Sequence, residues 1–210
     1  MSETAPIQSE TKSTRERILD AAEQLFAERG LAGTAVRDIA AGVGLNPASL
    51  YNHFPSKDLL YEAVLERGLQ PVMELLVELA SGEQTRDTED RAIDRVVTHL
   101  AGSPNLAKLI TYETLAGGER LARIGGKWLG PIYMRGIEAL QRSRAVEQWE
   151  AQELPLLMVA FQSLILGYFA MAPLLEQMFD LDATSPEGLA RQTAFLRKIT
   201  HLLIPPRDAV

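Results

Sequence analysis

Cysteine is absent from this sequence of 210 residues. The chain therefore has neither a disulfide framework nor a thiolate metal site. Its three histidines, His53, His99 and His201, fall in separate segments without metal-ligand spacing. The signatures HExxH, GxSxG, GxGxxG and the Walker loop are missing as well. We expect no metal, no cofactor and no enzymatic activity, although an enzyme whose side chains converge only in the fold stays an alternative.

Long hydrophobic runs are also lacking. A membrane-spanning helix needs an apolar run of about 18 residues or more. The nearest segment, residues 154–175, is interrupted by Pro155, Gln162, Ser163 and Pro173. A buried helix explains this segment better than a membrane span. Residues 1–12 are polar and do not follow the basic-then-apolar plan of a secretion signal, so we expect a disordered tail there. The predicted location is the cytoplasm, with no membrane association.

A surplus of positive charge, typical of proteins that bind nucleic acid, is missing too. The chain has 28 acidic and 21 basic residues, a net charge of −7. Residues 1–60 hold 6 basic and 8 acidic residues, a net −2. Only residues 34–57 turn positive, at +1, through Arg37 and Lys57 against Asp38. Any DNA-binding surface must therefore be local, which is possible because salt screens exposed charges over about 8–10 Å.

What the sequence does contain is a helical spacing of apolar residues, with no convincing alternation of period two. Ser13 and Glu16 fit a capping box that starts a helix over 14–29, which Gly30 ends. Thr34 is the expected N-cap of a second, short helix that ends at Gly44. Three further signals follow in order: the Asn46-Pro47 start of a third helix, its exit at Phe54-Pro55, and the Ser56 cap of a fourth.

The fourth helix is predicted to run to about residue 80, with Pro71 as a kink or break. A polar linker follows at residues 81–90. The apolar spacing then predicts helices over 89–101, 104–116, 119–142, 151–178 and 186–203, and we expect a bend in 119–142 at its glycines and Pro131. The fold class is all-α with about nine helices. A helix-turn-helix domain over 13–58 precedes a helical domain over 59–210.

Three short helices with a glycine turn between the second and the third describe a helix-turn-helix. The second helix of that motif enters the major groove of DNA, and the residues near its start face the base edges. Its candidate readers here are Asn46, Ser49, Asn52 and His53. Thr34 is expected to present a hydroxyl and free backbone N–H groups to a phosphate.

Residues 34–60, TAVRDIAAGVGLNPASLYNHFPSKDLL, resemble the signature of the TetR/AcrR family of transcriptional regulators. The matches are the opening threonine, Arg37, Ile39-Ala40, Gly44-Leu45, Ser49-Leu50-Tyr51, Phe54, Ser56-Lys57 and Leu59-Leu60. With the preceding helix, the resemblance covers roughly residues 14–65. It implies phosphate contacts by Thr34, Tyr51 and Lys57. It also implies a position near the DNA bases or the adjoining DNA backbone for five residues: Arg37, Pro47, Ala48, Ser49 and His53. Pro47 stands where other members of the family often have a polar residue. At this position the protein could therefore recognise a base only by shape or by contact with a methyl group.

Several of these residues have plainer interpretations. Tyr51 is alternatively a core aromatic with a solvated hydroxyl, and Asn46 a helix cap before it is a reader. His53 is alternatively an exposed helical histidine. Lys57 lies in the first turn of a helix, where the helix dipole does not favour a cation. A contact with a DNA phosphate would explain a lysine at this position. A helical adaptor protein is the second rival to a regulator, but it does not explain this set of residues at these spacings.

The resemblance further implies that residues 59–210 bind a small molecule and form a homodimer through helices 151–178 and 186–203. A protein of this kind is a regulator, most commonly a repressor, that a ligand releases from double-stranded operator DNA. The apolar character of the domain favours a hydrophobic ligand. The candidate lining residues, for each of which a plain core or surface role is the alternative, are Met73, Tyr112, Glu113, Trp128, Tyr133, Met158, Phe161, Gln162 and Tyr168.

Overall fold

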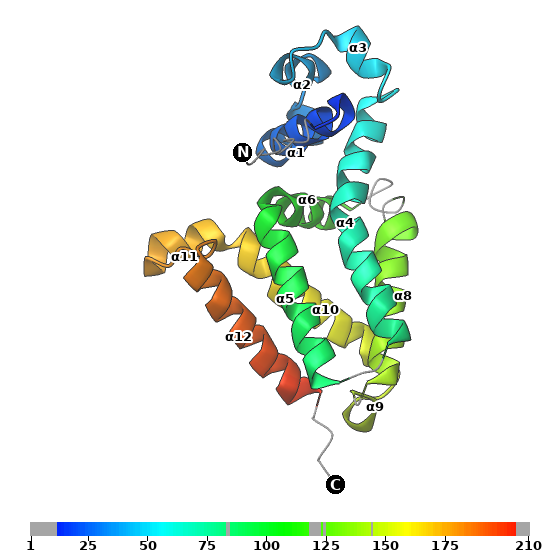
Figure 1. Ribbon diagram of the computed structural model, residues 1–210, viewed down its shortest axis with the longest axis vertical. Coiled ribbons are helices and arrows are strands. Elements are labelled where there is room, and N and C mark those ends of the chain that lie inside the picture. The colour runs from blue at the N-terminus through cyan, green and yellow to red at the C-terminus, as the bar shows by residue number, and fades with distance from the viewer. Residues whose placement is uncertain (1–11, 83–84, 118–122, 124, 144, 205–210) are drawn as a thin grey trace, which may run out of the picture. The chain divides into compact units, whose positions relative to one another are not determined.

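The computed structural model describes residues 12–82, 85–117, 123, 125–143 and 145–204. Within these ranges the chain forms helices and no strand, which confirms the all-α class. It divides into two compact units after Val64, rather than after residue 58 as predicted (Figure 1). The boundary lies later because Tyr61 packs its ring edge-to-face on Phe26 of the first unit, with centroids 5.0 Å apart. Of the predicted tail, only Lys12 lies within the described residues.

The first unit begins with α1 (Thr14–Gly33), followed by α2 (Val36–Gly42) and α3 (Pro47–Tyr51). The predicted capping box is confirmed, since the Glu16 N–H donates to Ser13 Oγ and the Ser13 N–H to the Glu16 carboxylate. Gly30 has φ +68° and kinks α1, so the regular helix ends where the sequence predicts. The last residues of α1 form a separate short turn after this kink.

The turn between α2 and α3 follows the sequence prediction closely. Gly44 has φ +73°, a conformation that side-chain-bearing residues avoid. Asn46 Oδ1 accepts from the Ser49 N–H at 2.8 Å, and Pro47 occupies the first turn of α3. Ser56 Oγ likewise accepts from the Leu59 N–H at 3.1 Å, where α4 begins. These local caps confirm the predicted starts of α3 and α4.

Thr34 differs from the prediction. It is not the N-cap of α2, which begins at Val36 after Ala35. Its side chain is buried, and its hydroxyl donates to the carbonyls of Leu25 at 3.0 Å and Gly30 at 2.8 Å. Because Gly30 kinks α1, the Thr34 N–H bonds to the Leu31 carbonyl instead of the Gly30 carbonyl, and the Thr34 hydroxyl gives the Gly30 carbonyl a donor. The expected presentation of this hydroxyl to a phosphate is therefore wrong for the described conformation.

Lys57 also has a role that the sequence did not reveal. Its ammonium donates to the carbonyl of Leu31 at 2.7 Å and to that of Thr34 at 3.0 Å. Both carbonyls belong to the C-terminal end of α1, where a cation is favoured by the helix dipole. The lysine in the first turn of α4 thus has a structural reason without any phosphate. We call Thr34 and Lys57, with the carbonyls that they bind, the α1 corner.

The second unit begins within α4 (Lys57–Ser81), which continues through Pro71. It goes on with α5 (Arg86–Gly102) and α6 (Pro104–Ala116). The predicted linker is wrong over 86–90, because Thr85 and Thr88 form a capping box that starts α5 there. The predicted helix over 119–142 is described as a π-helical turn, Gly125–Leu129, and α8 (Gly130–Arg142). The short α9 (Ala145–Gln148) was not predicted.

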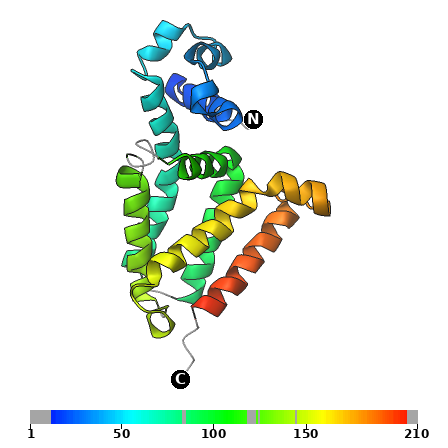
Figure 2. The same cartoon turned by 180° about the vertical axis from the view of Figure 1, so that it is seen from behind.

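The predicted helix over 151–178 is two helices, α10 (Leu154–Ala170) and α11 (Ala172–Phe179), bent by 60° (Figure 2). Pro173 explains the break, since proline fits the first turn of a new helix but not the interior of a continuous one. The last helix, α12 (Pro186–Leu203), matches its predicted range, and Ser185 caps it. Among the described helices, none is by itself long and apolar enough to cross a membrane, although the bent pair passes by length and composition.

Helix α10 packs against α6 and α8, and α12 packs against α5 (Figure 1). Two ion pairs join α5 to α12, one between Asp90 and His201 at 2.9 Å and the other between Asp94 and Arg197 at 2.6 Å. A buried cluster of Leu140, Leu154, Leu157 and Ile204 closes the end of the unit where these helices meet. The second unit is thus a layered helical body whose elements are fixed by apolar packing and specific polar ties.

We expect Thr34→Val to destabilise the first unit by about 1–3 kcal/mol, because it keeps the shape of the side chain but removes the hydroxyl that is shared between the Leu25 and Gly30 carbonyls. Thr34→Ser keeps the hydroxyl and should cost less. Urea unfolding monitored by circular dichroism measures both. Equal stability of the valine variant and the wild type would show that the hydroxyl does not hold the α1 corner.

Candidate DNA-binding surface and internal cavity

The surface of the first unit around α3 is polar and open. Within α3 only Leu50 is buried. The predicted reader residues are exposed, apart from the half-buried Ser49; they are Asn46, Pro47, Ala48, Tyr51, Asn52 and His53. The helix is therefore anchored by one leucine and by its caps. Nearly all of its remaining surface is available to a partner.

Tyr51 is 46% exposed, which excludes the alternative of a core aromatic. The aromatic core is built instead from Phe26, Tyr61 and Phe54, all of them buried. The guanidinium of Arg15 covers the Phe54 ring at 5.0 Å from its centroid. The Tyr51 hydroxyl is thus placed on the exposed side of the unit, as a residue that contacts a phosphate requires.

Arg37 is the exposed cation of this region, with 82% of its side chain accessible. Its Nε lies 3.5 Å from a carboxylate oxygen of Asp38, which also pairs with Arg29 at 3.2 Å. Exposed ion pairs of this kind are weak, so the guanidinium can change partners at little cost.

Two of the predicted DNA contacts are not on this surface. The Thr34 hydroxyl is buried, and two of the three N–H groups of the Lys57 ammonium are used in the α1 corner. Both residues support the surface from beneath by fixing the ends of α1, α2 and α4. No local pattern could have revealed this, because Lys57 lies 26 residues from Leu31 in sequence.

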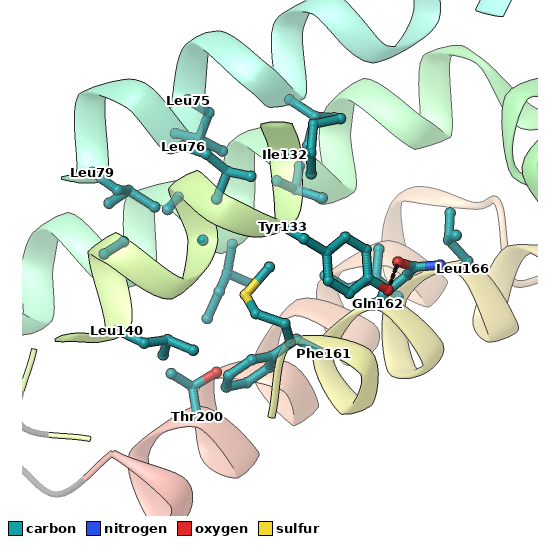
Figure 3. Close-up of a pocket in the computed structure, with 18 of the residues that line it drawn as sticks. Leu75, Leu76, Leu79, Ile132, Tyr133, Leu140, Phe161, Gln162, Leu166 and Thr200 are labelled. Atoms are coloured by element: carbon teal, nitrogen blue, oxygen red, sulfur yellow. Dashed lines mark hydrogen bonds between the residues drawn. The ribbon is translucent and has the colours of Figure 1, made fainter. Parts of the chain in front are cut away.

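The second unit contains a cavity of about 240 Å³ that is partly open to solvent (Figure 3). Leucine, isoleucine and valine side chains from α4, α5, α6, α8, α10 and α12 form most of its wall. Four of the predicted lining residues, Tyr133, Met158, Phe161 and Gln162, contribute to it. Small-molecule sites are usually cavities of this kind, mostly apolar with a few polar groups.

The other predicted lining residues do not line this cavity. Tyr112 is 53% exposed on α6, and Glu113 is buried elsewhere in that helix. Tyr168 donates instead to the backbone carbonyls of Ala183 and Gly188, and Met73 is not among the residues of the cavity wall. The side chain of Trp128 lies outside the described residues. Aromatic character alone was therefore a poor guide to the lining.

The polar groups of the cavity are few. The Tyr133 hydroxyl donates to the side-chain oxygen of Gln162, and Figure 3 shows the two groups pointing toward one another. Burial raises the pKa of Tyr133, which keeps its hydroxyl protonated as a donor. Glu89 and Thr200 also line the cavity, and sequence reasoning missed both. Glu89 lies where the predicted linker, residues 81–90, overlaps the start of the predicted helix over 89–101.

The arrangement is suited to binding. In the part of the chain that the structure describes, no group of three or more His, Asp or Glu side chains is placed to hold a metal ion. The cavity offers shape and hydrogen bonds, and the α3 surface offers exposed polar side chains on a helix.

Known proteins resemble the first unit in sequence. A profile of the family "Bacterial regulatory proteins, tetR family" matches residues 18–64. The HTH-type transcriptional repressor KstR2 of Rhodococcus jostii is 44% identical over 75 residues, which cover 35% of this chain and 37% of that protein. The HTH-type transcriptional regulator UidR of Escherichia coli is 37% identical over 59 residues, 28% of this chain and 30% of that protein. The matches thus span little more than a third of these relatives.

Solved structures extend the likeness to the whole fold. SmeT, the repressor of the Stenotrophomonas maltophilia multidrug efflux pump SmeDEF, aligns with a TM-score of 0.65 at 22% identity, covering 94% of this chain and 96% of SmeT. The TetR family regulator PfmR of Thermus thermophilus aligns with a TM-score of 0.64 at 19% identity, over 92% of this chain and all (100%) of PfmR. The profile match thus shows a TetR-family segment over residues 18–64, and the solved structures show a shared fold over most of the chain.

Proposed function

We propose that this protein is a sequence-specific transcriptional repressor that a small hydrophobic ligand releases from its operator DNA. The observation that carries the proposal is the exposure of α3. A helix anchored by Leu50 alone, after a glycine turn, leaves its polar residues free to enter a major groove. The relatives that match this unit are an HTH-type transcriptional repressor and an HTH-type transcriptional regulator by name. Such a protein acts in the cytoplasm.

In this proposal Tyr51 and Arg37 contact phosphates. The exposed residues of α3 and its flanking turns approach the bases; they are Asn46, Pro47, Ala48, Ser49, Asn52 and His53. The α1 corner acts indirectly. Lys57 and Thr34 hold the ends of α1, α2 and α4, so that α3 is presented as a rigid unit. The one remaining N–H of the Lys57 ammonium is available for a phosphate.

We further propose a homodimer through α10, α11 and α12. Large apolar side chains on these helices are exposed in the single chain, among them Leu156 at 67% and Leu202 at 64%. Large apolar side chains left exposed on neighbouring helices are typical of a protein interface. Two copies would place two α3 helices about 34–36 Å apart, on successive major grooves of one DNA face.

Ligand release follows from a shift between two conformations of the dimer. Helix α4 is the covalent link for this shift, because it begins at Lys57 of the first unit and brings Leu69, Leu75 and Leu79 to the cavity of the second. A ligand that binds better when α4 is displaced favours dimers whose α3 spacing does not fit DNA. If the ligand binds the released conformation more tightly by several kcal/mol, the operator changes from mostly occupied to mostly free.

Tyr51→Ala and Lys57→Ala should weaken operator binding for different reasons. Tyr51→Ala removes an exposed side chain, so DNA affinity should fall by about tenfold or more while stability is unchanged. Lys57→Ala opens the α1 corner, so affinity and unfolding free energy should fall together. The measurements are fluorescence anisotropy on a duplex selected from a random pool, at two salt concentrations, and thermal unfolding. Full affinity in both variants would refute the assigned surface.

A double variant, Leu156→Glu with Leu202→Glu, should weaken dimerisation by roughly thirtyfold or more, because charges replace apolar contacts at the proposed interface. Analytical ultracentrifugation over a concentration series measures this. The matched control is Leu115→Glu, which charges an equally exposed leucine, 80% accessible, on α6. An unchanged dimer in the double variant would place the interface elsewhere.

Gly136→Ala tests the cavity. A methyl group at Gly136 would overlap the end of the Met158 side chain, and both residues line the cavity. Met158 is flexible and should swing into the empty space, so ligand affinity should fall while the helix is as stable as before or more so. Gly102→Ala, at a position with open space around it, is the control. Calorimetric titration with a hydrophobic ligand distinguishes the two.

A further inference from the structure

The cavity is long, and polar groups lie toward both of its ends. Its wall includes Glu89 and Leu100 of α5, which lie eleven residues apart along the helix. At about 1.5 Å per residue this is a length of roughly 16 Å. Figure 3 shows Tyr133 and Gln162 together at one part of the cavity, away from Thr200. Its shape thus fits an extended ligand better than a compact one.

Glu89 and Thr200 belong to the same end. Their sequence neighbours Asp90 and His201 are paired across α5 and α12 at 2.9 Å. Thr200 is only 6% exposed, and its hydroxyl has no hydrogen bond among the described residues. This end of the cavity therefore combines a carboxylate with a hydroxyl that is available to a ligand.

The charges around this end leave Glu89 as the group without a close counter-ion. On the same helix Asp90 pairs with His201, and Asp94 pairs with Arg197. Within the described chain no ion pair or hydrogen bond joins the Glu89 carboxylate to another side chain. Burial raises the pKa of Glu89, whereas His201 and Arg86 act in the opposite direction. Its place in the first turn of α5 also favours the ionised form.

The rest of the wall holds no compensating cation. Among the described residues that line the cavity there is no lysine, arginine or histidine. A ligand carboxylate would therefore meet Glu89 and no opposite charge. A ligand cation would meet the carboxylate and the Thr200 hydroxyl, and would remove the cost of burying an unpaired acid.

We propose that the cavity selects an elongated hydrophobic cation, with its protonated amine held by Glu89 and Thr200 and its apolar body lying along α5 toward Tyr133 and Gln162. The inference rests on the proposed function, because it names the class of ligand for the same cavity. At the far end the Gln162 amide nitrogen can donate to an acceptor on the ligand, since only its oxygen is used by Tyr133.

A matched series of decylammonium, decanol and decanoate tests the charge preference. Calorimetric titration into the full-length protein should show decylammonium binding about tenfold or more tightly than decanol, with decanoate weakest. In Glu89→Gln the preference of amine over alcohol should fall below about threefold, with decanol affinity unchanged. Asp87→Asn is the control, because it removes an exposed acid from the same first turn of α5 outside the cavity.

Equal binding of amine and alcohol by the wild type, tightest binding of decanoate, or a preference that survives in Glu89→Gln would each overturn the inference. So would the absence of binding by all three. Thermal unfolding of Glu89→Gln ensures that a loss reflects the site and not the fold. Operator release is measured separately. Release by decanol without any charge preference would leave the repressor proposal standing, whereas a wild type that binds no operator would overturn that proposal alone.

Discussion

The closure of the end of α1 is the constraint on which the first unit depends. Gly30 breaks the helix and leaves backbone carbonyls that need donors. Thr34 provides one donor from the next turn, and the Lys57 ammonium provides two more from the start of α4. One junction therefore fixes the relation of α1, α2 and α4. Helix α3 needs only Leu50 and its caps to stay in place, so its other side chains do not have to serve the fold.

The same junction shows where sequence reasoning reaches its limit. The caps at Ser13, Asn46 and Ser185 act on residues three positions away, and all three follow from local pattern. Thr34 has the local appearance of an N-cap, yet its hydroxyl bonds backward to Leu25 because α1 is broken. Lys57 bonds to residues that are distant from it in sequence. Its position in the sequence therefore matched the family signature but did not reveal that its ammonium binds the end of α1. The all-α class and most helix bounds were predictable, whereas this junction was not.

The cavity illustrates a second limit. Apolar periodicity identifies the inner face of each helix, but a void forms only where six helices fail to fill the space between them. Tyr133, Met158 and Phe161 were predicted as aromatic or methionine side chains of the helical domain, and Gln162 as a polar group beside them. Glu89 was not, because the polar sequence around it resembles a linker until Thr85 and Thr88 are seen to cap α5. The bend after Ala170 was missed for a related reason, since the apolar run continues through it.

The charge of the chain links the two units in function. With Lys57 engaged in the α1 corner and Arg37 near Asp38, one copy has little positive charge to offer DNA. In the proposed dimer, affinity would come from two copies bound together, because the second contact is made at a high effective concentration. Helix α12 brings Thr200 to the cavity and leaves Leu202 exposed on the proposed interface. A ligand at Thr200 would then act on a helix of that interface, where a small change is enough to alter the spacing of the two α3 helices.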